Sequence, residues 1–368
     1  MSPAARTVSA LLAAAVIAAA SPGLRADEAE SALEKYKDRV NQSVDRALAY
    51  LAKAQHKEGY FPSRMGKSSA VSSLAVMAFL SKGYTPGTGP YGDNIDRGID
   101  FVLSCLKPNG LLAPRSAHGA MYSHGISTLM LSEVSGMVEP DRQKRIDKAL
   151  SGAVRLILTA QQVKKPAQYK GGWRYQATSR DSDISLTGWS LMALRSARNN
   201  GSQIPKLAID DGVGFVLRCR VRPRGRPARK KRSGKFGPGV GFTYQPGGGP
   251  GLARTGTAVL CLELCGKHRC PEAIEGGDWI LSHPAKSYGS SYFYYALYYC
   301  SQAMFQLGGR HWQQFAPYMY EMMLKFQRKD GSWPQGGGGE GTAGPCYSTA
   351  MGVLAMAVSY RQLPIYQR

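Results

Sequence analysis

The sequence predicts an all-α protein, an α/α toroid (an α6/α6 barrel) of about six pairs of outer and inner helices. Two observations support this prediction. Helix-like segments alternate along the chain between an amphipathic, charged type and a small-residue, apolar type. Blocks containing a glutamine, a tight glycine turn and an aromatic residue recur between them. Self-similarity at intervals of roughly 43 to 68 residues indicates a helical repeat.

The amphipathic segments are predicted to form the outer helices. In the third of them, Ile146, Leu150, Val154 and Ile157 share one stripe, and the opposite face is charged. A helix with one polar and one apolar side covers a core and faces solvent. The predicted outer helices are Ala32–Ala54, Asn94–Leu106, Pro140–Gln161, Pro205–Arg218, Ile274–His283 and Gln313–Gln327.

The apolar segments are predicted to form the inner helices, because helices that are apolar all round are buried. Their Ala, Gly, Ser and Thr residues allow neighbouring helices to approach closely. No terminal pair has a polar capping face, which favours a closed ring over an open solenoid. The predicted inner helices are Ser69–Lys82, Ser123–Ser135, Ser185–Ala197, Arg254–Cys265, Tyr292–Leu307 and Tyr347–Tyr360.

The recurring blocks resemble those of a known family. The clearest block runs from Gln327 through Gly331 to Trp333, and Gln161 followed by Gly171 and Trp173 repeats it. Together with the inner helices and the pair count, these blocks resemble the prenyltransferase and squalene-oxidase repeat family, which includes squalene–hopene cyclases and protein prenyltransferase β subunits. The resemblance covers nearly the whole mature chain. It implies that the blocks are structural and tie helix ends together.

The first 26 residues are predicted to be an export signal, with Arg6 before an apolar run from Leu11 to Ala20 that is too short to span a bilayer. Cleavage after Ala20, or retention of the segment as an N-terminal membrane anchor, is the alternative. Residues 27–368 would then form a single domain, which we expect to be periplasmic or extracellular. The seven cysteines are an odd number, so at least one thiol is expected to stay free or to pair between chains.

The net charge of +22 is unevenly distributed, since Arg218–Lys235 contains ten Lys and Arg residues and no acid. Its prolines and glycines predict an exposed basic loop inserted in the domain. Such a loop can contact an anionic polymer or membrane surface, or it is a solvated insertion. No aromatic residues interleave with the arginines, so no nucleic-acid partner is expected.

Asp181 and Asp183 form the main candidate catalytic motif, directly before an inner helix. They can cap that helix, bind a metal, or supply a buried general acid. The segment resembles the acidic motif of squalene–hopene cyclases, which implies that Asp183 is the protonating acid and Asp181 its partner. Ile184 replaces the second partner. The ligand set by which protein prenyltransferases bind zinc is incomplete, so neither metal nor cofactor is expected.

The loops that enter the inner helices are expected to rim a central cavity. His124 is a candidate base near neutral pH, although a structural, hydrogen-bonded role is the favoured interpretation. Candidate binding residues are Trp189, the one tryptophan on an inner helix, and Arg254, Tyr292 and Tyr347.

Three functions fit these observations. The first is an enzyme acting on an isoprenoid or other lipid, with Asp183 as the acid. The second is a non-catalytic binding module for an envelope lipid or anionic polysaccharide. The third is a uronate polysaccharide lyase with Arg254 as the base.

Overall fold

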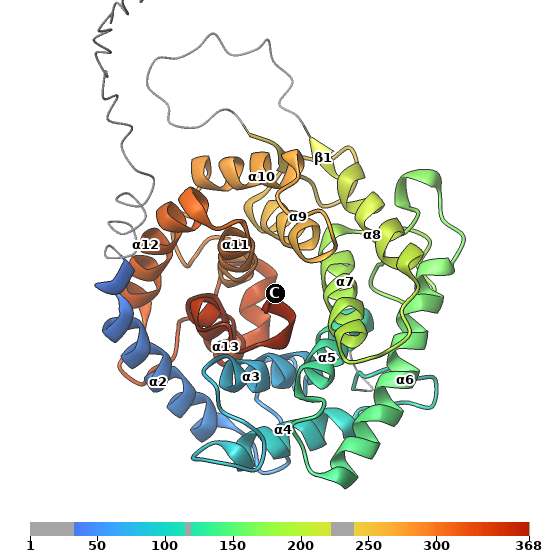
Figure 1. Ribbon diagram of the computed structural model, residues 1–368. Helices are drawn as coiled ribbons and strands as arrows, with labels where there is room; N and C mark the ends of the chain where they lie inside the picture. The colour runs from blue at the N-terminus through green and yellow to red at the C-terminus, as the bar shows by residue number, and fades with distance from the viewer. Residues whose placement is uncertain (1–32, 115–118, 222–238, 368) are drawn as a thin grey trace, which may run out of the picture.

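The computed structural model describes residues 33–114, 119–221 and 239–367. The predicted export signal, 1–26, lies outside the described residues. Figure 1 shows the described helices as two concentric rings. The outer ring contains α2 (Lys37–Ala54), α4 (Gly92–Ser104), α6 (Pro140–Gln162), α8 (Lys206–Arg218), α10 (Pro271–Ser282) and α12 (Gly309–Phe326). The inner ring contains α3 (Ser69–Ser81), α5 (Ala120–Val134), α7 (Ile184–Asn199), α9 (Leu252–Leu264), α11 (Phe293–Leu307) and α13 (Gly344–Met356).

This arrangement confirms the predicted α/α toroid, and the ring is closed. Helix α13 packs against both α2 and α3, so the last pair meets the first. The Gln327 amide nitrogen donates to the Ser43 carbonyl at 2.8 Å, and the Ser43 hydroxyl donates back to the Gln327 side-chain oxygen at 2.8 Å. The block that first indicated a repeat therefore joins the two ends of the ring.

Small residues allow the inner helices to pack closely. A Cβ added at Gly188 of α7 would lie 2.4 Å from the methyl carbon of Thr257 in α9. One added at Gly256 of α9 would lie 2.9 Å from the Cys300 backbone nitrogen in α11. Because real Cβ atoms do not approach other atoms so closely, these glycines fix the spacing of the inner ring.

The glutamine and tryptophan blocks tie neighbouring outer helices together. The Gln161 side chain donates to the carbonyls of Gly171 and Ala208, each at 2.8 Å. The buried Trp173 indole donates to the Ile157 carbonyl at 2.7 Å. Gly171 has a φ of 85°, and a side chain there would collide with the Asp211 carbonyl oxygen. Each block therefore closes a turn and joins two outer helices.

A second repeated contact anchors most inner helices to the loop before them. A backbone N–H in the loop donates to a hydroxyl in the first turns of the helix, as from Trp173 to Thr187 at 3.2 Å. The same contact joins Phe61 to Ser72, Phe242 to Thr255 and Trp333 to Thr349. The loops are thus fixed at the end of the ring where the inner helices begin.

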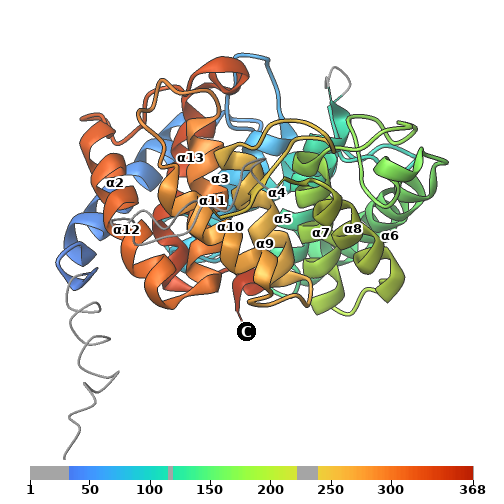
Figure 2. The same cartoon turned by 90° about the horizontal axis from the view of Figure 1, so that it is seen from above.

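The opposite end is closed by the C-terminal segment, which includes the 3₁₀ turns η3 (Ala357–Tyr360) and η4 (Pro364–Tyr366). Figure 2 shows the C-terminus at the lower edge of the molecule, and Figure 1 shows it inside the inner ring. The Tyr366 and Tyr298 hydroxyls are 2.7 Å apart, and the Ile365 N–H donates to the buried Glu133 carboxyl at 3.1 Å. One end of the ring is therefore filled by the chain itself.

The first residues of the predicted basic loop lie in regular structure. Arg218 is the last residue of α8, and β1 (Arg220–Val221) pairs antiparallel with β2 (Gly241–Phe242). Arg220 is fixed by ion pairs to Glu272 and Glu275, each at 3.1 Å. Residues 222–235 of the predicted loop lie outside the described part of the chain.

All seven cysteines lie in the described part of the chain and are free thiols, four of them buried. Within the same residues, no helix has both the length and the apolar character needed to span a bilayer.

Candidate functional site

A cavity of about 490 Å³ opens at the end of the toroid where the inner helices begin. Its walls come from the first turns of the inner helices and from the loops before them, including Ser68, Ser185, Arg254 and Ala343. The sequence predicted this location because it placed the starts of all inner helices at one end. The size is within the range of small-molecule sites, about 300–1,000 Å³.

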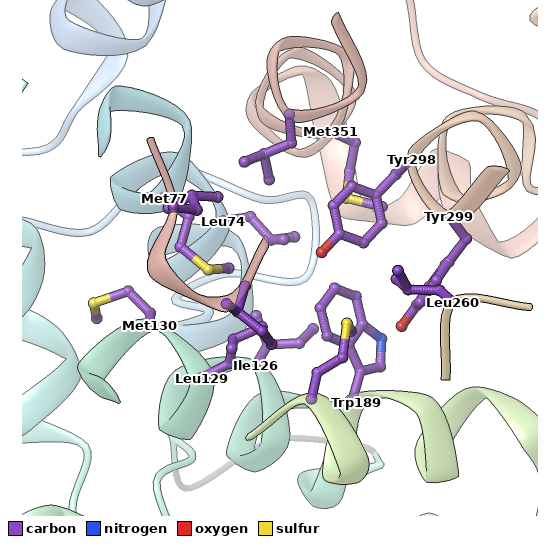
Figure 3. Close-up of a cluster of buried hydrophobic side chains, with 14 of the residues drawn as sticks. Leu74, Met77, Ile126, Leu129, Met130, Trp189, Leu260, Tyr298, Tyr299 and Met351 are labelled. Atoms are coloured by element: carbon purple, nitrogen blue, oxygen red, sulfur yellow. The ribbon is translucent and has the colours of Figure 1, made fainter. Parts of the chain in front are cut away.

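The deep part of the cavity is apolar. Val71 and Leu74 from α3, Ile126 from α5 and Trp189 from α7 line it. Trp189 is buried and stacks on Tyr298, with ring centroids 5.6 Å apart and planes inclined by 13°. Figure 3 shows Leu74, Ile126 and Trp189 converging from different inner helices on the centre of the ring. The predicted binding residue Trp189 therefore forms part of the cavity wall.

Tyrosines also line the cavity. Two of them, Tyr175 and Tyr244, have hydroxyls 2.5 Å apart. The Arg174 guanidinium lies over both rings, 4.4 Å from the Tyr175 centroid and 5.3 Å from that of Tyr244. The complete set of tyrosines that line the cavity is Tyr122, Tyr175, Tyr244, Tyr292, Tyr295 and Tyr347. This arrangement combines apolar ring faces with hydroxyl groups, as amphiphilic ligands require.

Asp183 caps α7. Its carboxyl accepts the N–H groups of Ser185 and Leu186, each at 2.9 Å, and pairs with Arg174 at 3.1 Å. Burial raises its pKa to about 6, although these hydrogen bonds and the arginine act in the opposite direction. Asp183 is fully buried and is not among the residues that line the cavity. The capping role, which the sequence left open, is thus the role that its contacts fill.

Asp181 lies outside the cavity as well. It pairs with Arg174 at 3.2 Å and accepts from the Gln245 side chain at 3.2 Å. With Arg174 and Tyr175 it borders a neighbouring surface groove. Arg174 therefore forms ion pairs with both aspartates. It was not predicted from the sequence, because it lies on a loop where no local pattern distinguishes it.

His124 is structural, which corrects its prediction as a base. Its Nδ1 accepts the Leu112 N–H at 3.1 Å, so Nε2 carries the proton and donates to the Ala153 carbonyl at 3.1 Å. Burial lowers the pKa of His124 to about 4. The residue replaces the hydroxyl that anchors the other loops, and it does not line the cavity.

Glu340 is the cavity residue that sequence reasoning missed. Among the described residues that line the cavity it is the sole carboxyl group, and it is buried. It accepts the N–H groups of Tyr295 at 2.8 Å and Tyr294 at 3.2 Å at the start of α11. Burial raises its pKa to about 7, while these bonds act to lower it. The four glycines before Glu340 predict a flexible loop, but in the structure this segment forms the 3₁₀ turn η2 (Gly338–Ala343).

The three remaining predicted binding residues all line the cavity: Arg254, Tyr292 and Tyr347. Arg254 donates to the Gly249 carbonyl at 3.0 Å and lies 5.8 Å from the Tyr244 ring centroid. The Tyr292 backbone has a φ of 57°, in the left-handed region that is unusual for an aromatic residue. Across residues 33–114, 119–221 and 239–367, no group of three or more His, Cys, Asp or Glu side chains is arranged to hold a metal.

Comparison with solved structures identifies the architecture. An inactive α-1,6-mannanase variant from Salegentibacter sp. is similar, with a TM-score of 0.59, 8% identity and coverage of 88% of this chain and 99% of that one. A family 76 glycoside hydrolase from a bovine Bacteroides thetaiotaomicron strain has a TM-score of 0.52 at 10% identity, covering 87% of this chain and 77% of that one. The molecule is an α/α toroid. At these identities the likeness concerns the fold alone.

A type II terpene cyclase from Scytonema overlaps more weakly, with a TM-score of 0.38, 14% identity and coverage of 89% of this chain and 99% of that one. No protein-family model matches the sequence, and no curated protein is detectably similar to it.

Proposed function

We propose that the protein binds an isoprenoid or another lipid in its central cavity. The observation that carries this proposal is the apolar depth of the cavity, with Leu74, Ile126 and Trp189 in its wall. Transfer of a hydrocarbon chain from water to such a wall contributes about 25 cal/mol per Å² of apolar surface buried. The exposed Tyr175 and Tyr292 at the cavity mouth suit the polar end of an amphiphile. The proposal retains the expected export, so the ligand would come from the cell envelope.

Proton transfer, if the ligand is transformed, is assigned to Glu340 rather than to Asp183. Glu340 lines the cavity, and a carboxyl group with a pKa near 7 can exchange a proton at neutral pH. Asp183 is committed to α7 and Arg174 and does not reach the cavity surface.

Two measurements test the binding proposal. Mass spectrometry of organic extracts from the purified protein should detect a bound hydrophobic molecule. Titration with farnesol should change the tryptophan fluorescence, because Trp189 lies in the cavity wall. The variant Ala253→Phe, which adds bulk to the cavity lining, should weaken farnesol binding at least about tenfold, whereas Ala253→Ser should not. Equal binding by the two variants, or no binding by the wild type, would refute the proposal.

A further inference from the structure

Exposed apolar side chains gather around the cavity mouth. Six large hydrophobic residues are exposed among the described residues, and three of them line the cavity. These are Met65 with 63% exposure, Tyr292 with 52% and Tyr175 with 38%. They come from the loops before α3, α11 and α7, which are far apart in the sequence. Single exposed apolar residues need no explanation, but a group around one opening indicates an interaction surface.

The backbone at Tyr292 supports this interpretation. Its left-handed conformation is maintained by an N–H bond to the Gly337 carbonyl at 3.3 Å and by the bridge between Ser291 and Gly337. The result is a tyrosine that is half exposed, directly before Phe293, which is buried. Strain that the surrounding structure maintains is typical of functional positions.

Two arginines lie at or beside the mouth. Arg254 lines the cavity, and the exposed Arg64 adjoins Met65. Within the described part of the chain, neither Arg64 nor Arg254 forms an ion pair with a carboxylate. Glu340, the carboxyl group in the cavity, is buried beneath this surface. The mouth thus combines tyrosines, a methionine and unpaired cations.

This combination suits the interface of an anionic bilayer. Tyrosine is enriched at the level of the lipid headgroups, and arginine and lysine are attracted to anionic lipids. The overall charge of +22 acts in the same direction. A cavity for an apolar ligand also needs a route that avoids water, and a mouth resting on a bilayer provides one.

We infer that the cavity mouth docks on the surface of an anionic lipid bilayer, with Met65, Tyr175 and Tyr292 entering the interface. A lipid then passes from the bilayer into the cavity. This inference rests on the proposed function for its ligand, but the docking surface can be tested separately.

The test is flotation with vesicles of phosphatidylcholine and phosphatidylglycerol in equal parts, compared with phosphatidylcholine alone. The double variant Met65→Ser/Tyr292→Asn removes two apolar side chains, and Asn tolerates the left-handed backbone. The matched control, Leu207→Ser/Met137→Ser, removes two exposed apolar side chains (68% and 37% exposed) that are not in the cavity lining. Circular dichroism and thermal unfolding confirm that both variants are folded.

We expect the wild type and the control to float with the mixed vesicles and the mouth variant to partition at least about tenfold less. Equal flotation of the two variants, or failure of the wild type to float, would overturn the inference. Binding to a soluble anionic polysaccharide with no flotation would also overturn it. Flotation of Ala253→Phe separates the two proposals, because added bulk in the cavity should weaken farnesol binding at least about tenfold and leave docking intact.

Discussion

The carboxyl group of Glu133 offers a quantitative test of how the closed end of the toroid is held. Glu133 is buried, accepts the Ser196 hydroxyl and accepts the Ile365 N–H at 3.1 Å. Burial raises its pKa from 4.5 to about 7, with the two hydrogen bonds acting in the opposite direction. The substitution Glu133→Gln keeps the shape of the side chain and replaces the ionisable carboxyl group with a neutral amide.

The raised pKa determines the sign of the pH effect. A carboxyl group with a higher pKa in the folded state binds its proton more tightly there, so its contribution to stability is fully present below pH 4.5. That contribution is lost as the pH rises through about 7. At 1.36 kcal/mol for each pKa unit, the loss is on the order of 3 kcal/mol in the free energy of unfolding.

Urea unfolding of the wild type and of Glu133→Gln at about pH 5 and pH 8 measures this loss of stability. Other buried acids titrate in the same range, so the informative quantity is the difference between wild type and Glu133→Gln. The wild type should lose about 2–3 kcal/mol more than the variant between the two pH values. Exposed Glu139→Gln is the matched control and should follow the wild type. A difference below about 1 kcal/mol would refute this account of Glu133.

Two further predictions concern the fold. Trp333→Ala should lower the free energy of unfolding by about 3–5 kcal/mol, because Trp333 is fully buried and its indole donates to the Met323 carbonyl at 2.8 Å. Urea unfolding measures this, and a loss below about 1 kcal/mol would contradict the structural role. Truncation after Arg361 removes Leu363, Ile365 and Tyr366 from the closed end, so it should lower Tm and increase binding of an apolar dye. An unchanged Tm would contradict the closure.

The sequence predicted what depends on local pattern. The spacing of apolar residues distinguishes outer from inner helices, and the turn blocks are marked by their glycine and aromatic residues. The two rings and the pairing of outer with inner helices could therefore be predicted from the sequence. Tyr347 and Arg254 were found because every inner helix begins at the same end. Glu340 was not found from the sequence. It lines the cavity only because its loop packs on the start of α11, where it accepts the N–H of Tyr295, 45 residues earlier in the chain. A contact of this kind leaves no periodic trace.

The most informative departure from the repeat is at α11. In α3, α7 and α9 a hydroxyl four residues after the N-cap receives the N–H of the preceding loop. In α11 that position is Ala296, which has no side-chain acceptor. The start of α11 is instead held by Glu340 from the turn before α13, while its N-cap Tyr292 keeps a strained backbone. The repeated contacts therefore serve the fold. Where α11 lacks them, a buried titratable carboxyl lines the cavity and an exposed tyrosine lies at its mouth, and function is expected at this helix.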